Sequence, residues 1–390
     1  MGGGGDEGWG MSRLYRAAAV FLLTLLWFAA SSADAGELWS RDRAAAWYGA
    51  QRWIVGANYV PASAVNQIEM WRADTFDPER IDRELGLAQD VGMNTVRVFL
   101  HDSLWQEDAP GLRRRIDIFL GIAARHGVRP ILALFDSCWN PVSAAGPQPP
   151  PVPGVHNSQW VQGPSARALA DPAEYGRLER YVRDVVGAFG HDPRVLAWDI
   201  WNEPGNDNGK LFPGLEAANK TELTAALLRQ AFSWARAAGA EQPLTSGLWQ
   251  GGRDWSQLEA LSEIERIQLE QSDILSFHSY EGPKAFEARI RQLTAYGRPI
   301  VCSEFLARAA GSTVDAILPI AQRLHVGAVN WGLVAGRTQT YLPWDSWRRP
   351  YVGREPTDWQ HDLFQADGSP YRESEVELIR KLIAESRASQ

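Results

Sequence analysis

Short apolar runs alternate with amphipathic stretches along most of the chain. Eight runs are apolar at nearly every position, and they cover residues 53–58, 95–100, 130–135, 195–201, 243–249, 274–280, 299–305 and 327–333. A strand that is apolar on successive residues needs cover on both of its faces, as the strands of a parallel sheet do. We therefore interpret the eight runs as parallel β-strands.

The stretches between these runs carry helix start and stop signals. Asp77 followed by Pro78 is an N-cap with proline at the first helical position, and Gly92 ends that helix. Asp171 and Pro172 repeat the start signal. Eight strands that alternate with helices predict an α/β fold of the (β/α)8 TIM barrel type, and a doubly wound open sheet is the alternative.

The N-terminal 35 residues have the pattern of a leader that is removed. A positive segment at residues 11–16 precedes an apolar run of 14 residues, Ala17 to Ala30, and small residues follow at 33–35. Fourteen apolar residues are few for a membrane span. We therefore predict that residues 1–35 are a leader and signal peptide, and that residues 36–390 form one domain, secreted or periplasmic.

The charge and the amino-acid composition indicate which kinds of partner the protein can bind. The 390 residues carry a formal charge of −8, so neither nucleic acid nor, after cleavage of the signal, a membrane is expected as a partner, and we expect a monomer. The 18 tryptophans require an aromatic core or a surface for a flat apolar ligand. The two cysteines, Cys138 and Cys302, follow strands on opposite sides of the barrel, so we expect buried thiols rather than a disulfide.

Active sites of such barrels lie at the carboxyl ends of the strands. Polar and aromatic residues gather at those ends, namely Asn58, Arg97, Asp136, Asn202, Glu203, Trp249, His278, Tyr280, Glu304 and Trp331. Glu203 follows the fourth strand and Glu304 ends the seventh, on opposite walls of the mouth. Cleaving an acetal between sugars needs one carboxylic acid and one carboxylate, so the pair suits glycoside hydrolysis.

Neighbours suggest which glutamate does which task. Arg97 and the phenol of Tyr280 would favour the charged form of Glu304 and lower its pKa. Trp198 and Trp201 flank Glu203 in an apolar strand, where desolvation would raise its pKa and keep a proton available. Sequence alone leaves open whether the carboxylate spacing gives retention or inversion of anomeric configuration.

The motif Trp201-Asn202-Glu203-Pro204, together with a glutamate ending the seventh strand, resembles glycoside hydrolase clan A, most closely family 5 of cellulases and β-mannanases. The resemblance runs in order from about Trp53 to Trp331. It implies Glu203 as acid/base and Glu304 as nucleophile of a retaining, metal-free hydrolase of β-linked glycans, with no cofactor. It also implies supporting roles for Arg97, Asn202, His278 and Tyr280, and a sugar platform at Trp331.

One position departs from the family pattern. Many members carry histidine after the third strand, where this chain reads Phe135-Asp136-Ser137-Cys138-Trp139. The departure weakens a cellulase assignment, so mannanase-like, xylanase-like and exo-acting or transglycosylating activities stay open.

Two long connections follow strands three and eight, at residues 137–170 and 334–372. The proline-rich centre of the first, residues 146–154, should form a stiff wall that carries Trp139 and Trp160 to the cleft. The second contains Tyr341, Trp344, Trp347, Tyr351 and Trp359, of which about half should face a ligand. The predicted substrate-binding residues are Trp331, Asn58, Asp136, Trp139, Trp249, Trp344 and Trp347.

Two alternatives from other classes remain at this point. A carbohydrate-binding barrel would use the aromatic cleft without chemistry. A metal-dependent barrel hydrolase typically has a His-x-His pair after the first strand, where this chain has Asn58-Tyr59. Five other histidines are expected at the surface or at helix ends, namely His101, His126, His191, His325 and His361.

Overall fold

The computed structural model describes residues 1–2 and 36–388. The predicted leader, apart from its first two residues, lies outside the described residues, so the division into leader and single domain stays a prediction. Among the described residues, no helix combines the length and the apolarity that crossing a membrane requires.

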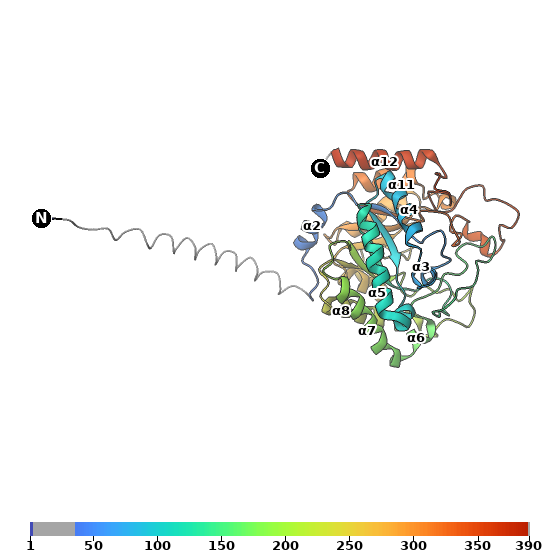
Figure 1. Ribbon diagram of the computed structural model, residues 1–390, viewed down its shortest axis with the longest axis horizontal. Coiled ribbons are helices and arrows are strands. Elements are labelled where there is room, and N and C mark those ends of the chain that lie inside the picture. The colour runs from blue at the N-terminus through green and yellow to red at the C-terminus, as the bar shows by residue number, and fades with distance from the viewer. Residues whose placement is uncertain (3–35, 389–390) are drawn as a thin grey trace.

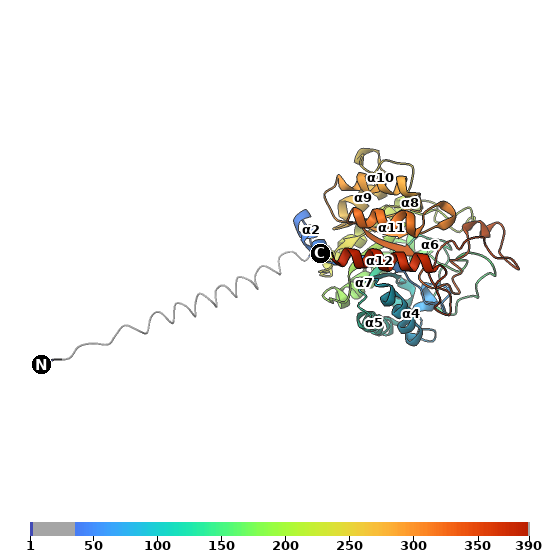
Figure 2. The ribbon, with the colours of Figure 1, turned by 90° about the horizontal axis from the view of Figure 1, so that it is seen from above.

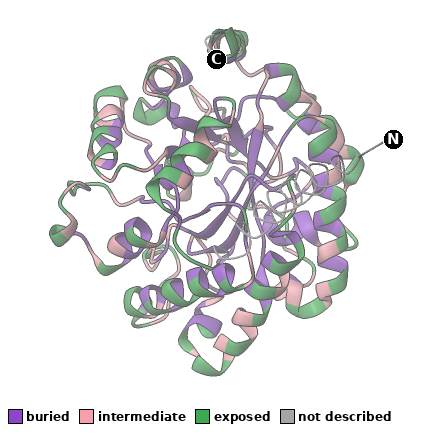
Figure 3. Ribbon diagram, turned by 90° about the vertical axis from the view of Figure 1, so that its left-hand side faces the viewer, coloured by how far each residue is buried: buried purple, intermediate pink, exposed green. Residues whose placement is uncertain are grey.

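Eight parallel strands form the centre of the molecule, which confirms the predicted (β/α)8 barrel (Figure 3). They are β1 (Val55–Asn58), β2 (Thr95–Phe99), β3 (Ile131–Asp136), β4 (Ala197–Asn202), β5 (Leu244–Thr245), β6 (Leu275–His278), β7 (Ile300–Phe305) and β8 (Gly327–Trp331). Their order in the sheet is β5-β4-β3-β2-β1-β8-β7-β6. An isolated parallel bridge between Leu248 and Phe277 brings β5 and β6 together at the remaining seam.

The fifth strand is shorter than its apolar run, which extends over residues 243–249. Beyond Thr245 the chain has the single bridge at Leu248 in place of a regular ladder, and side chains hold it as well. The Ser246 hydroxyl donates to the carbonyl of Trp201, and the Gln268 amide donates to the carbonyl of Gly247. These bonds satisfy the backbone where β5 stops pairing.

Helices surround the strands, buried toward the barrel and exposed on their outer faces (Figure 3). They are α2 (Arg41–Gly49), α3 (Gln67–Trp71), α4 (Pro78–Val91), α5 (Asp102–Arg125), α6 (Ala166–Ala170), α7 (Tyr175–Phe189), α8 (Lys220–Ala237), α9 (Glu263–Gln271), α10 (Pro283–Thr294), α11 (Val314–Arg323) and α12 (Glu373–Ala388). The start and stop signals of α4 are confirmed, because the Asp77 side chain caps the backbone N–H of Arg80 and Gly92 adopts a φ of 90°.

The two ends of the barrel differ. Figures 1 and 2 place α2 at one end and the long connections that lead into α6 and α12 at the other. Helix α12 buries Val376, Ile379 and Ile383 on one stripe, and it packs on α11 and α4. The helices and strand ladders thus leave the carboxyl ends of the strands free to carry a site.

Candidate active site

A cavity of about 610 Å³ lies at the carboxyl ends of the strands. Both glutamates of the predicted pair, Glu203 and Glu304, line it. Its volume falls within the range of about 300–1,000 Å³ that is usual for small-molecule sites. Other predicted residues in the lining are Trp139, Trp160, Asn202, Tyr280, Trp331, Trp344 and Trp347.

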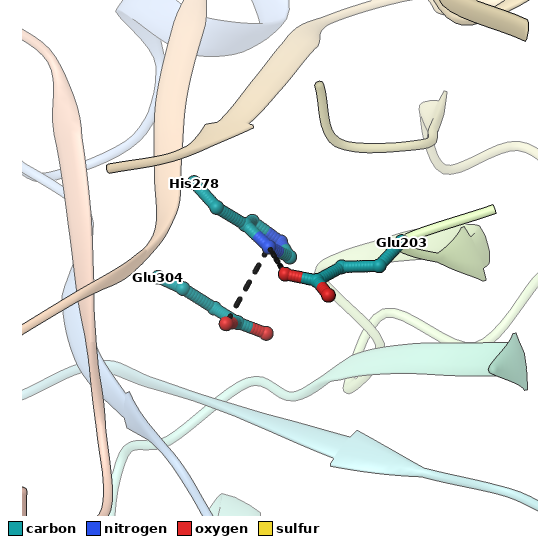
Figure 4. Close-up of side chains that lie close together, drawn as sticks. All are labelled: Glu203, His278 and Glu304. Atoms are coloured by element: carbon teal, nitrogen blue, oxygen red, sulfur yellow. Dashed lines mark hydrogen bonds and ion pairs between the residues drawn. The ribbon is translucent and has the colours of Figure 1, made fainter. Parts of the chain in front are cut away.

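The two carboxylates face each other with His278 beside both (Figure 4). One oxygen of Glu203, one oxygen of Glu304 and a ring nitrogen of His278 all lie within 4.8 Å of one another. The Nδ1 atom of His278 is 2.9 Å from Oε1 of Glu203 and 3.4 Å from Oε2 of Glu304. His278 therefore links the two acids, and the three atoms could also hold a cation.

Glu304 receives a hydrogen bond on each carboxylate oxygen. The Arg97 guanidinium donates to Oε1 at 2.9 Å, and the phenol of Tyr280 donates to Oε2 at 2.6 Å. Both partners are those that the sequence predicted. Burial, followed by the charge of Glu304, raises the pKa of Tyr280 well above its ordinary value, so the phenol keeps the proton that it donates.

Arg97 is fully buried and bonds to four side chains at once. In addition to Glu304, its guanidinium donates hydrogen bonds to Oδ2 of Asp199 at 2.6 Å, Oδ1 of Asn58 at 2.8 Å and Oδ1 of Asn202 at 2.6 Å. Sequence reasoning missed Asp199, although a lone charge within the apolar strand β4 was a signal for it. The contacts fix residues from three strands, β1, β4 and β7, around one charge on β2.

The donors around Glu203 come mainly from loops. Besides His278, the Cys138 thiol lies 3.1 Å from its Oε2, and the Asn206 amide donates to the same oxygen at 2.6 Å. Cys138 lines the cavity and is not the fully buried thiol that was predicted, whereas Cys302 is buried, and both are free. The backbone of Glu203 adopts a φ of 44°, a left-handed conformation that non-glycine residues seldom adopt.

The pKa directions are the reverse of those predicted for the pair. Burial raises the pKa of Glu304, and the opposing charges of His278 and Arg97 do not cancel that effect. Arg97 divides its charge between Glu304 and Asp199, which the sequence argument had not included.

For Glu203, burial also acts to raise the pKa, but the hydrogen bond and charge of His278 outweigh it and lower the pKa below its ordinary value. The predicted desolvation by Trp198 and Trp201 rested on sequence adjacency. Neither indole lines the cavity, because their N–H groups bond to Gln242 and Ser137 instead.

Three predicted substrate-binding residues lie outside the cavity lining. Asp136 is buried and accepts hydrogen bonds from the Asn202 amide and the Trp160 indole, so it orients other residues. Asn58 donates to backbone carbonyls beneath the site. The indole of Trp249 bonds to the carbonyl of Pro204. Asn58 and Asp136 do end their strands as predicted, whereas Trp249 lies four residues beyond the end of β5.

The predicted position of one histidine was wrong. His361, expected at the surface, is buried and lines the cavity, with its Nδ1 bonded to the carbonyl of Leu306. His101 is buried too, but it lies at a helix end as expected because it caps the N-terminus of α5, and His191 and His325 are exposed as expected. His156, in the loop after β3, also lines the cavity and carried no sequence signal.

The aromatic residues of the loop after β8 divide as expected. Trp344 and Trp347 line the cavity. Tyr341 packs against Trp359 at 5.0 Å between ring centroids, and the backbone N–H of Tyr351 donates to the carbonyl of Gly154 at 2.8 Å. The second group therefore holds the loop in place.

Comparison with known proteins gives a family match for most of the chain. The family described as cellulase (glycosyl hydrolase family 5) matches residues 61–336. A search of curated protein sequences found no match.

Solved structures share the fold at low identity. GH5_18 from Streptomyces cattleya, in complex with GlcNAc, has a TM-score of 0.59 at 13% identity over 87% of this chain and 82% of its own. An exo-β-1,4-mannosidase from Opitutaceae bacterium strain TAV5 has a TM-score of 0.59 at 18% identity over 86% and 60%. An endo-β-1,4-mannanase from Thermotoga petrophila has a TM-score of 0.54 at 15% identity over 88% and 79%.

Removing the buried charge should destabilise the barrel. Arg97→Gln leaves Asp199 and Glu304 without their cation, so we expect the free energy of unfolding to fall by about 3–5 kcal/mol. Urea unfolding followed by circular dichroism measures the change. Arg114→Gln, at an exposed position on α5, is the matched control and should change stability by less than about 0.5 kcal/mol. Equal stability of the two variants would contradict the central role of Arg97.

Proposed function

Because the chain belongs to the cellulase family of glycosyl hydrolases, family 5, we propose that it hydrolyses β-linked glycans with retention of anomeric configuration. The observation that carries the proposal is the closeness of Glu203 and Glu304, whose nearest oxygens lie within 4.8 Å. Retaining enzymes hold their carboxyl groups about 5–5.5 Å apart, whereas inverting enzymes leave about 6.5–9.5 Å for a water.

In the proposed first step, Glu304 attacks the anomeric carbon while Glu203 gives its proton to the departing glycosidic oxygen. A covalent glycosyl ester on Glu304 forms as the glycosidic bond breaks. Glu203, now a carboxylate, then takes a proton from water, and that water attacks the anomeric carbon and releases Glu304. The donors Arg97 and Tyr280 aim both oxygens of Glu304 and stabilise it as the leaving carboxylate.

Glu203 suits the acid role by its position. Its side chain is 14% exposed, against 5% for Glu304, so it reaches further into the cavity. A sugar that fills the cavity removes the remaining water from Glu203, and this desolvation raises its pKa toward the protonated form. The Nδ1 atom of His278 lies close to both carboxylates, so their proton affinities are coupled and belong to the pair rather than to one residue.

The substrate we propose is a β-linked glycan that packs on the indoles of the cavity. Sugar rings present apolar C–H faces, and Trp139, Trp331, Trp344 and Trp347 offer aromatic faces to them. The structural relatives named above include an exo-β-1,4-mannosidase, an endo-β-1,4-mannanase and a GH5_18 protein in complex with GlcNAc, so β-mannosides are the first candidates, ahead of glucan and xylan.

We also propose export, on the basis of the leader pattern in residues 1–35. The expected result is a mature N-terminus near Gly36 in protein recovered outside the cytoplasm of expressing cells. N-terminal sequencing of that protein measures it. Recovery of the uncleaved chain from the cytoplasm alone would contradict export.

Retention and the two carboxylate roles are tested together. With β-linked manno-, gluco- and xylo-oligosaccharides, proton NMR at early times should show the β-anomer as the first product. Glu203→Gln should lower kcat by about 10²- to 10⁴-fold, the usual contribution of a general acid. Glu304→Gln should leave no measurable turnover, because the amide cannot form the glycosyl ester.

Controls make the outcome specific. Glu107→Gln, at an exposed position on α5, should behave as wild type, and circular dichroism shows that each variant is folded. Since Glu203, His278 and Glu304 could hold a cation, the wild type is also assayed after EDTA treatment, and unchanged turnover supports a metal-free reaction. An α-anomer as first product, or full activity in both active-site variants, would overturn the proposal.

We expect the thiol of Cys138 to influence the pKa of Glu203, the proposed acid. Its thiol hydrogen bond favours the charged form of Glu203, so Cys138→Ala should raise the pKa of that carboxyl. Activity requires the protonated acid, and a higher pKa therefore moves the alkaline limb of the kcat/KM profile to higher pH. Cys138→Ser keeps a donor and should stay close to wild type. Identical profiles for the wild type and the alanine variant would contradict this role.

A further inference from the structure

The loops after β3 and β8 are joined to each other above the barrel. We call residues 138–160 and 338–351 the joined loops. Seven hydrogen bonds connect them, and their partners are Gly154 and Gln339, Tyr351 and Gly154, His156 and Ser346, His156 and Leu342, Asn157 and Thr338, Gln339 and Val152, and Gln339 and Val155. Their distances lie between 2.7 and 3.0 Å.

The joined loops close one side of the barrel mouth. In the sheet, β3 and β8 are separated by β2 and β1, so loops that meet from β3 and β8 pass over that sector. Trp347 extends the closure, because its ring stacks on Trp139 at 5.1 Å and contacts Phe212 of the loop after β4 at 5.9 Å. A continuous wall thus runs from β8 past β1, β2 and β3 to β4.

The opposite side of the cavity, at β5 to β7, has few lining residues. Among the described residues, none in the connection between β5 and β6 lines the cavity, and the ends of β6 and β7 contribute only Tyr280 and Glu304. A chain seated in the cavity would therefore leave it on the side of β5 to β7. Cutting inside a glycan requires the chain to leave the site on both sides of the cleaved bond.

The backbone conformation of the wall is fixed by its surrounding contacts. Three of its residues, Trp139, Asn157 and Gln339, adopt positive φ values of 66°, 47° and 55°. Residues with side chains hold such conformations only where the surrounding contacts determine them. At Gln339 those contacts are the side-chain bonds to Gly154, Val152 and Val155, which belong to the seam itself.

The wall also offers unpaired polar atoms. Asn157 is 1% exposed, lines the cavity, and its Oδ1 has no hydrogen-bond partner in the described part of the chain. The buried indole Nε1 of Trp347, another lining residue, likewise has none there. Buried polar atoms normally pair, so one free acceptor and one free donor at a cavity wall suit the hydroxyls of a sugar.

We infer that the joined loops make the cavity a pocket for the end of a glycan chain, so that the enzyme releases units from a chain end instead of cutting inside. The inference rests on the proposed hydrolase function and adds the form of the substrate. Asn157 and Trp347 are the residues that would contact the terminal part of that chain.

The experiment follows product sizes from hexasaccharides of β-1,4-linked mannose, glucose and xylose, each reduced with borodeuteride to mark one end. Mass spectrometry at early times should show one short product and its complementary remainder. A ladder of products from several internal bonds would overturn chain-end action while leaving the hydrolase proposal intact. No hydrolysis of any glycan by the folded wild type would overturn the hydrolase proposal and this inference with it.

Variants of the joined loops test whether the hydrogen bonds between them restrict cleavage to chain ends. Gln339→Gly removes three seam hydrogen bonds at a φ that glycine accepts, and internal cleavage products should then appear. Gln365→Gly, at an exposed site in the same connection, should keep the wild-type product pattern. Internal products from both variants, or from neither, would contradict a role of the seam.

A second variant addresses the unpaired acceptor. Asn157→Gly also suits the local φ, and it should lower kcat/KM on the hexasaccharides by about tenfold, as expected for one lost hydrogen bond of about 1.4 kcal/mol. Product size should be unchanged, because the wall remains. Unchanged kcat/KM would remove Asn157 from the pocket.

Discussion

The buried guanidinium of Arg97 is the interaction on which the site depends. Burial disfavours its charge, but the carboxylates of Asp199 and Glu304 outweigh that effect and keep the pKa of Arg97 above its ordinary value. A buried charge is tolerated only with paired charges and satisfied hydrogen bonds. Because Asp199 and Glu304 belong to β4 and β7, the pairing exists only when the barrel is closed and in register.

The same cation sets the geometry of its neighbours. Asn58 and Asn202 each accept a hydrogen bond from Arg97, and Asn202 is held from its other side by Asp136. Glu304 is therefore fixed by residues of the barrel interior. Glu203 instead takes its donors from His278, at the end of β6, and from loop residues Cys138 and Asn206. One carboxylate belongs to the scaffold and the other to the loops.

This division explains what the sequence could predict. Strand runs, the caps of α4 and the strand-end positions of Glu203 and Glu304 depend on local patterns, and all are found in the structure. Both pKa directions were wrong, because they depend on which side chains from distant segments surround each acid. His156 and His361 reach the cavity through loops whose path no periodic pattern encodes.

The loops also couple access to chemistry. Six of the seven non-glycine residues with positive φ among the described residues lie in loops at the barrel mouth: Trp139, Asn157, Glu203, Leu306, Gln339 and Asp362. The segment from Asp136 to Trp139 connects the wall to the proposed acid. Asp136 accepts a hydrogen bond from the backbone N–H of Cys138, and the thiol of Cys138 contacts Glu203. Trp139 then stacks on Trp347 in the wall. A shift of the wall would therefore also move a donor on Glu203, so the segment that limits which sugars enter also affects how readily the acid gives up its proton.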